Sequence, residues 1–437
     1  MELVAIHLLT LVGFTRIAEL FPVLAPLQLG KIAFALGGVV LAVCLSRHRG
    51  PGSLFDLPLL KPVLLLFLLA ALSVPLSVWR SGALESFEGV AKTIFIFAVL
   101  SFAGARTGGN SVRLALLIGV VVLGGMMVVE KGSGRAFVSS TYDANDIALL
   151  FAMFLPVLAA EGMARRGIVR FVAWGGACIA LLGMAMTQSR GGVVALVVVA
   201  LQMVLSSRRR GLLLLALSLA GAIFYLSADA AYWDRFALVG DASDDYNMTA
   251  ETGRLQLWKN GLSMLLRNPV LGVGVGQFAA ANYTFGNGAY LTAHNTYIQV
   301  ATEMGVFALW VYVCLLRNII AFAREGATSP GLDEAARMRW LGVRYGITAF
   351  MVGILFVSQA FAISFYGFMA MVSAMRSGQL ALDVPAVVQT EPTSTASRRR
   401  GRKGSDTRIR SLRTPLSDTR WNGLPPLRGA GKAGEDV

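Results

Sequence analysis

Three residues that lie far apart in the sequence have side chains suited to chemistry on a phosphorylated substrate. Arg190 lies in TQSRGG, where the glycines at 191 and 192 would let the backbone approach an anion closely. Arg254 opens a predicted helix, where a guanidinium and outward-pointing backbone N–H groups together suit a phosphate. His294 starts the stretch HNTYIQVATEMG, and an imidazole is a suitable acid or base near neutral pH. The sequence therefore offers an anion site and a candidate base.

Each of these residues also has a purely structural interpretation. Arg190 could extend its guanidinium to the membrane surface while its stem stays in an apolar layer. Arg254 could be an exposed arginine at that surface. Histidines are more often structural than catalytic, and His7 in an apolar run and His48 in an arginine-rich loop are examples. Residue type alone does not decide between the two interpretations.

A polar stripe follows His294. Asn295 is a good N-cap, and Asn295, Gln299 and Glu303 repeat every four residues along the predicted helix, so they share one face. In an apolar helix such a stripe must face protein or water rather than lipid. His294 is therefore expected at the mouth of a polar cleft, with Asn295 and Glu303 as supporting residues. Glu303 is also the residue that a transporter could use.

The stretch DAND supplies two further supporting residues, Asp143 and Asn145, at the start of another predicted helix. Asn145 or Asp146 is the expected N-cap. The two carboxylates could also help to hold a cation, but the sequence shows no third ligand. We predict neither a metal site nor a cofactor.

The elements that must position these residues are membrane helices. The chain has 437 residues, of which 55% are hydrophobic and 15% charged, and its mean hydropathy is +0.64. Apolar runs long enough to cross a bilayer predict an all-α, polytopic membrane protein with roughly twelve transmembrane helices. The predicted spans lie near residues 3–20, 31–46, 60–78, 89–104, 112–129, 145–161, 169–186, 191–206, 211–227, 296–316, 340–357 and 359–375.

The positive charges predict the orientation. With a cytoplasmic N-terminus, the dense arginine clusters at 47–49, 106–113, 165–170, 208–210 and 317–339 all fall in cytoplasmic loops, and SRRRGRK at 398–404 falls in a cytoplasmic tail. The net charge of +14 therefore indicates topology rather than nucleic-acid binding. Arg190, Arg254 and His294 then share the outer face.

Four regions follow from this topology. Residues 1–227 are predicted to form an N-terminal transmembrane bundle, and 228–293 a large outer loop that contains an amphipathic helix. That helix has Leu255, Trp258 and Leu262 at helical spacing and is expected to lie along the membrane surface. Residues 294–376 form the C-terminal transmembrane helices, and 377–437 a disordered basic tail that touches anionic lipid.

Four motifs occur in series: SRGG at 189–192, G-R-x3-W at 253–258, NPVLGVGVGQF at 268–278, and H-N-x-Y-x5-E-x-G at 294–305. DANDIALL at 143–150 fits the same pattern. Together they resemble the bacterial O-antigen polymerase and O-antigen ligase superfamily over residues 1–376. Each motif is weak alone, but their order and the large outer loop are specific.

The resemblance implies a C-type glycosyltransferase fold and an undecaprenyl-pyrophosphate-linked glycan as donor. By position, Arg190 and Arg254 match the arginines that hold the pyrophosphate, and His294 matches the residue that activates the acceptor hydroxyl. It further implies the bacterial inner membrane with a periplasmic active site, a metal-independent reaction, and a role in O-antigen, lipopolysaccharide or exopolysaccharide synthesis. A single displacement would invert the anomeric centre. A chain-length regulator or a flippase of the same pathway is an expected partner.

The resemblance leaves the acceptor open. It is another lipid-linked repeat in a polymerase, which we favour, or lipid A-core in a ligase. The competing class is a transporter or flippase of lipid-linked glycans, which should carry charges near the bilayer midplane and paired inverted halves. The sequence shows no such repeat. A scaffold for an assembly complex would rest only on the basic tail.

Overall fold

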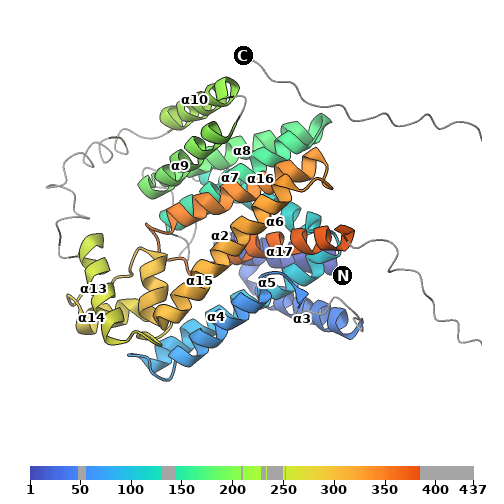
Figure 1. Cartoon of the computed structure of the whole chain (residues 1–437). Helices are drawn as coiled ribbons and strands as arrows, with labels where there is room; N and C mark the ends of the chain where they lie inside the picture. Colours follow the sequence, from blue (N-terminus) through green and yellow to red (C-terminus); the bar gives the residue numbers. More distant parts are fainter. Residues whose placement is uncertain are drawn as a thin grey trace, which may run out of the picture. The chain divides into compact units, whose positions relative to one another are not determined.

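The computed structural model describes residues 1–47, 56–129, 143–207, 210–227, 233, 250 and 252–383. They belong to the first of two compact units, Met1–Pro385, whereas the second, Ala386–Val437, lies outside the described residues. The described part contains helices and no strand (Figure 1). The predicted all-α fold class is therefore confirmed.

Every span predicted from hydropathy overlaps a helix. The helices are α1 (Glu2–Thr15), α2 (Ile17–Leu20), η1 (Pro22–Leu27, a 3-10 helix), α3 (Leu29–Arg47), α4 (Leu60–Ser73), α5 (Arg80–Ala105), α6 (Asn110–Val129), α7 (Ala144–Ala164), α8 (Gly167–Thr187), α9 (Arg190–Ser206), α10 (Arg210–Ser227), α13 (Arg254–Arg267), α14 (Phe278–Phe285), α15 (Thr296–Thr328), α16 (Glu334–Gly353) and α17 (Ile363–Asp383).

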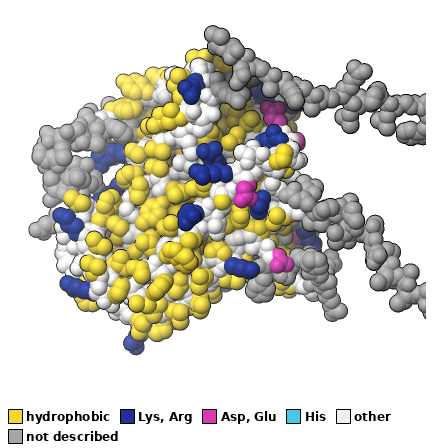
Figure 2. Space-filling view, viewed as in Figure 1, with side chains coloured by type: hydrophobic (Ala, Val, Ile, Leu, Met, Phe, Trp, Pro, Cys, Tyr) yellow, Lys and Arg dark blue, Asp and Glu magenta, His cyan; other side chains and the backbone are white. Residues whose placement is uncertain are grey.

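Among the described residues, 6 segments are long and apolar enough to cross a membrane: Val23–Val43, Arg80–Ala105, Asn110–Val129, Ala144–Ala164, Gly167–Thr187 and Thr296–Thr328. Shorter apolar helices, α1, α4, α9 and α10, accompany them. Large hydrophobic side chains are exposed on several helices, and Figure 2 shows such side chains spread over the visible face. An apolar exterior of this extent suits lipid contact. The chain is a polytopic membrane protein, and the larger number of crossings stays a prediction.

The helices α7 and α16 form an antiparallel pair through glycine contacts. A methyl group at Gly342 would lie 2.6 Å from Cβ of Ala160, and one at Gly353 would meet the Leu149 side chain. Small residues let membrane helices approach closely, because lipid provides no hydrophobic force that would drive them together. This pairing brings the end of α16 beside the start of α7.

The helix α15 is not the continuous span that the sequence predicted. Gly305 has a φ of 86° and interrupts the helix. The rings of Tyr297 and Tyr312 lie 6.5 Å apart, whereas a straight helix would separate these residues by about 22 Å. The chain therefore folds back at Gly305 into a short arm, 296–304, and a long arm, 306–328.

Backbone contacts explain the reversal. The break frees the carbonyl groups of Thr302 and Glu303, which accept hydrogen bonds from the N–H groups of Val273 (2.9 Å) and Gly274 (3.0 Å). The N–H of Val306 donates to the Pro269 carbonyl at 2.9 Å. A side chain at Gly305 would collide with Val270. The segment NPVLGVGVG is thus the partner of the break in α15.

The described part of the predicted outer loop, residues 252–293, folds over the short arm of α15. It has a small core of its own, made of Met264, Val273, Phe278, Ala281 and Ala293. The helix α13 packs on α15 with Leu257, Gly261 and Met264 buried. The stripe that the sequence singled out is a different one: its Leu262 is 56% exposed, and its contact with the membrane surface stays a prediction.

One predicted boundary falls inside a helix, and part of the predicted outer loop is outside the described residues. The predicted tail begins at 377, but α17 continues to Asp383, and the rest of the tail lies outside the described residues. In the predicted outer loop, 228–232, 234–249 and 251 also lie outside them.

Candidate functional site

His294 lies in a strained and tightly held stretch of backbone. Its φ is 48°, in the left-handed region that few non-glycine residues adopt. On one side, the Ala293 carbonyl accepts a hydrogen bond from Trp258 Nε1 at 3.0 Å. On the other, Asn295 Oδ1 caps the short arm by accepting from the N–H groups of Tyr297 and Ile298 at 3.0 and 3.1 Å. Such strain persists only where the surroundings enforce it, and it is frequent at functional sites.

Burial and charge both favour the neutral form of His294. The side chain is half-buried, and this desolvation lowers its pKa below the ordinary 6.5. The nearby Arg254 guanidinium lowers the pKa further, while the Asp143 carboxylate opposes this by raising it. The imidazole is therefore unprotonated near neutral pH, which is the form that accepts a proton. The three residues come from separate regions of the sequence.

Arg254 is the first residue of α13, as predicted. Gly253 is the N-cap, so the unsatisfied N–H groups of the first turn lie next to the guanidinium. Trp258, one turn further on, makes the hydrogen bond to the backbone beside His294. The G-R-x3-W motif thus ties an arginine at a helix start to the backbone of the histidine.

Arg190 is likewise the first residue of a helix, α9. The preceding Ser189 caps the helix by accepting from the Gly192 N–H at 3.4 Å, and its hydroxyl donates to Asn145 Oδ1 at 2.9 Å. Asn145 Nδ2 in turn donates to Asp143 Oδ2 at 2.9 Å. This chain of hydrogen bonds fixes the start of α9 beside the start of α7.

The cap of α7 differs from the prediction. Asp143 is the N-cap rather than Asn145 or Asp146, and Asp143 and Asp146 form a reciprocal capping box. The Asp143 carboxylate therefore serves the helix end, the Asn145 side chain and the electrostatics of His294 at once. Asn145 was predicted as a supporting residue, and the structure shows its link to Ser189.

Sequence reasoning missed the contribution of residues 354–362. The N–H of Thr296 donates to the Ile354 carbonyl at 2.8 Å, and its hydroxyl donates to the Val357 carbonyl at 2.8 Å. The Thr296 hydroxyl also accepts from the Gln359 N–H at 2.9 Å. The chain between α16 and α17 is therefore unwound over a longer stretch than predicted. The polar pair Ser358–Gln359 inside an apolar run was the available signal.

Glu303 does not join this group. Its side chain is 3% exposed and accepts hydrogen bonds from the N–H groups of Gly276 (2.9 Å) and Phe278 (3.3 Å). Gln299 Nε2 approaches the same carboxylate at 3.4 Å. Glu303 thus fixes the GVGVG segment against the short arm of α15. The predicted polar stripe exists, and Glu303 on it faces protein, which is one of the two surroundings expected for it.

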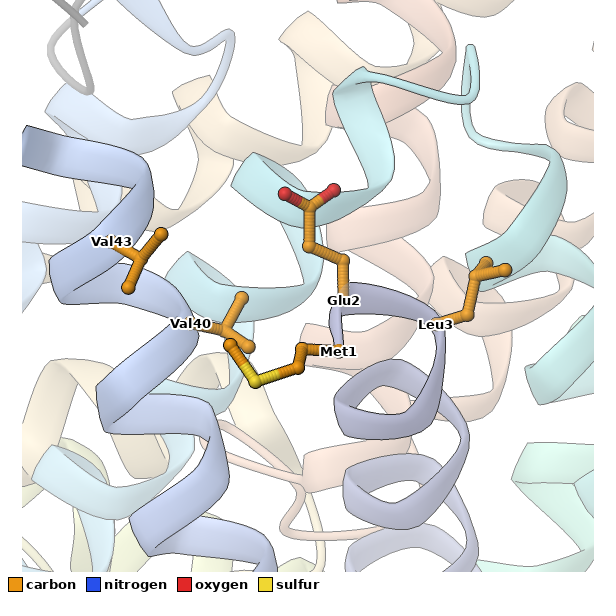
Figure 3. Close-up of a pocket in the computed structure, with 5 residues that line it drawn as sticks. All are labelled: Met1, Glu2, Leu3, Val40 and Val43. Atoms are coloured by element: carbon orange, nitrogen blue, oxygen red, sulfur yellow. The ribbon is translucent and has the colours of Figure 1, made fainter. Parts of the chain in front are cut away.

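A separate hollow of about 440 Å³ lies between α1 and α3 (Figure 3). Met1, Leu3, Val40 and Val43 give it mostly apolar walls, and Glu2 forms an ion pair with Arg106. This hollow contains none of the residues that the sequence singled out for chemistry. Within the part of the chain that the structure describes, no cluster of histidine, cysteine or carboxylate side chains could hold a metal.

The fold and the site together define a class: a polytopic helical membrane protein with a half-buried histidine just before α15, near Arg254 of α13 and Asp143 of α7. The start of α9 is joined to the start of α7 by the Ser189–Asn145 hydrogen bond. Residues 175–313 match the family model described as O-antigen ligase. The match includes Arg190, Arg254, His294 and Glu303, and it ends before α16. A comparison with curated proteins gives no match. The predicted resemblance to O-antigen ligases is confirmed over this segment.

Proposed function

We propose that this protein is a membrane glycosyltransferase that transfers a glycan from an undecaprenyl-pyrophosphate donor to a sugar hydroxyl on the periplasmic face of the bacterial inner membrane. The observation that carries the proposal is the grouping of His294 with Arg254 and Asp143. The Ser189–Asn145 hydrogen bond extends this grouping to the start of α9. The O-antigen ligase match supports the same class of reaction.

The donor pyrophosphate suits the two helix starts. Arg190 and Arg254 each open a helix, so a guanidinium lies at the first turn at each position, where the helix dipole favours a negative charge. The glycosidic bond to pyrophosphate breaks as negative charge develops on the leaving oxygen. Preorganised positive charge stabilises that charge and lowers the barrier. These residues can do so without a metal.

The acceptor hydroxyl needs a base, because an alcohol is a poor nucleophile near neutral pH. A neutral imidazole at His294 takes the hydroxyl proton while the oxygen attacks the anomeric carbon. The new glycosidic bond forms as the bond to the pyrophosphate oxygen breaks, and undecaprenyl pyrophosphate leaves. A single displacement inverts the configuration at the anomeric carbon. Burial beside Arg254 keeps the base unprotonated.

We favour a polymerase, whose acceptor is another lipid-linked repeat, over a ligase that uses lipid A-core. A flippase is less well supported, because the buried carboxylate that a transporter could use, Glu303, is occupied by the N–H groups of Gly276 and Phe278. A chain-length regulator or a flippase of the same pathway remains a proposed partner.

The test is reconstitution of the purified full chain in liposomes with a lipid-linked oligosaccharide. We expect new glycosidic bonds and an equal amount of released undecaprenyl pyrophosphate. Lipid A-core in a parallel sample separates the two enzymes, since a ligase forms product only when it is present. Movement of intact donor across the bilayer without new bonds would replace the proposal with a flippase.

A further inference from the structure

A groove of about 460 Å³ runs along α16, away from the site. The helix α16 packs against both α9 and α15, and these two helices barely touch each other in the described residues. The groove is therefore open between them, with α16 as its floor. At one end it reaches Tyr297 and Leu355, close to the Thr296–Ile354 hydrogen bond.

The two ends of the groove differ in chemistry. Near the His294 site its lining is mainly apolar, with Met351, Val352 and Leu355. At the far end it is lined by Arg324, Arg344 and Thr348, and none of its lining residues is acidic. Figure 2 shows Lys and Arg side chains lying among hydrophobic ones on the visible face of the molecule. One end of the groove is apolar and the other carries positive charge, so the groove complements the acyl chain and the anionic headgroup of a phospholipid.

The two arginines of the groove differ from nearby arginines, which form ion pairs within the fold. Among the described residues, Arg339 pairs with Glu161 and Arg376 with Glu325, whereas Arg324 and Arg344 make no ion pair there. Gln202 also lines the groove, and its side chain carries no charge.

The dimensions fit one leaflet. From Arg344 to Leu355 the groove spans eleven residues of sequence, or about 16 Å at the rise of an α-helix. One leaflet contributes half of a hydrocarbon core that is about 30 Å thick. An acyl chain whose headgroup is held at Arg344 would therefore end beside Leu355.

We propose that the groove binds an anionic phospholipid of the leaflet opposite the His294 site. Arg324 and Arg344 hold its phosphate, and its acyl chain lies along Met351, Val352 and Leu355. The inference stands on the groove alone and does not rest on the proposed function.

The test uses the full chain in nanodiscs and two photoreactive phosphatidylglycerols, one with a diazirine at the end of the acyl chain and one with a diazirine beside the headgroup. We expect the first probe to label the peptide containing Met351 and Leu355, and the second to label the peptide containing Arg344. The reversed pattern would show a lipid with its headgroup at His294 and overturn the proposal.

Variants test the charge and the shape separately. Arg324→Gln with Arg344→Gln should lower labelling by both probes about tenfold, as expected when charge-assisted hydrogen bonds to a phosphate are lost. Arg317→Gln, an exposed arginine of α15 outside the groove, serves as the matched control and should label as wild type. Val352→Trp keeps both arginines and should block labelling by filling the groove.

Three results would contradict the proposal. If labelling fell equally in Arg317→Gln and in the double variant, the lipid would only be attracted to a positively charged surface. Full labelling in the double variant, with an unchanged melting temperature, would exclude a role for the two arginines. Competition by inorganic phosphate as strong as that by unlabelled phosphatidylglycerol would show a site for free anions rather than for a lipid.

Discussion

The two ends of α7 use charge in opposite ways. At its C-terminal end, Glu161 forms ion pairs with three arginines: Arg113 at 3.2 Å, Arg165 at 2.5 Å and Arg339 at 3.1 Å. The N-terminal end lies about 24 Å away along the helix. There Asp143 caps α7, and Asn145 accepts a hydrogen bond from Ser189, the cap of α9. One end is a closed ion cluster that joins α6, α7 and α16, whereas the other is a meeting point of helix starts.

The comparison teaches that an arginine's surroundings, rather than its sequence position, indicate its role. Arg113 is 4% exposed and its charge is matched by a carboxylate. Arg190 and Arg254 stand at helix starts, which already favour anions. A buried ion pair maintains structure, while positive charge added to a helix start suits a ligand with negative charge.

Apart from loss of the proposed base itself, the largest effect should come from the helix starts. Arg254→Ala is expected to lower the rate of glycan transfer by roughly 10²–10³-fold, because a donor to a developing negative charge is lost. Arg254→Lys should recover part of the rate. Product formed per minute in liposomes measures both variants. Arg267→Ala, an exposed arginine at the other end of the same helix, should keep wild-type activity, and an equal loss in it would contradict a specific role for Arg254.

At the other end of α7, the expected effect is on stability. Glu161→Gln leaves the buried Arg113 guanidinium without its counter-charge and should destabilise the fold by about 3–5 kcal/mol. The melting temperature of the purified protein reports this. Glu88→Gln breaks an exposed pair with Lys92 and should change the melting temperature little. A Glu161→Gln protein as stable as wild type would show that the cluster is not structural.

A smaller effect is expected where the two helix starts are joined. Asn145→Ala removes the acceptor for the Ser189 hydroxyl. Loss of this hydrogen bond should raise the activation free energy by about 1 kcal/mol, which lowers kcat roughly fivefold. KM should change less, since Asn145 positions α9 rather than touching substrate. A loss as large as that in Arg254→Ala would mean that Asn145 contacts the reacting groups directly.

The smallest effect concerns pH. Burial and Arg254 lower the pKa of His294, so activity should fall only when the pH drops through a value below 6.5. Asp143 raises this pKa, so Asp143→Asn should move the acid limb to still lower pH, whereas Arg254→Gln should move it upward. Modification of His294 by diethyl pyrocarbonate against pH follows the same titration without requiring activity. A shift of the acid limb to higher pH in Asp143→Asn, or to lower pH in Arg254→Gln, would contradict the proposed effects of these two residues on the pKa of His294.

The sequence predicted the all-α membrane class of fold for physical reasons, and the site residues stay a prediction. Hydropathy defines membrane helices because the bilayer demands long apolar segments. The positions of the arginine clusters placed 113, 165 and 339 on one face, and these three meet at Glu161. The same argument placed Arg254 and His294 together, and the structure brings them near each other.

The remaining features depend on tertiary contacts. The break at Gly305 requires the backbone of Pro269 as a partner, and hydropathy cannot register that interaction. Glu303 was expected in the cleft because its spacing matched Asn295 and Gln299, but its carboxylate instead binds the backbone of residues 276–278. Periodicity identifies the face of a helix, while the partner of that face comes from a distant segment.

The central claim is that the helix starts around His294 carry out glycan transfer. The most direct test is release of undecaprenyl pyrophosphate by His294→Ala in liposomes, with His7→Ala as the histidine control. Loss of a general base should lower release by about 10²–10⁴-fold, while His7→Ala and the folded state of both variants remain as in wild type. Wild-type release by His294→Ala would contradict the account.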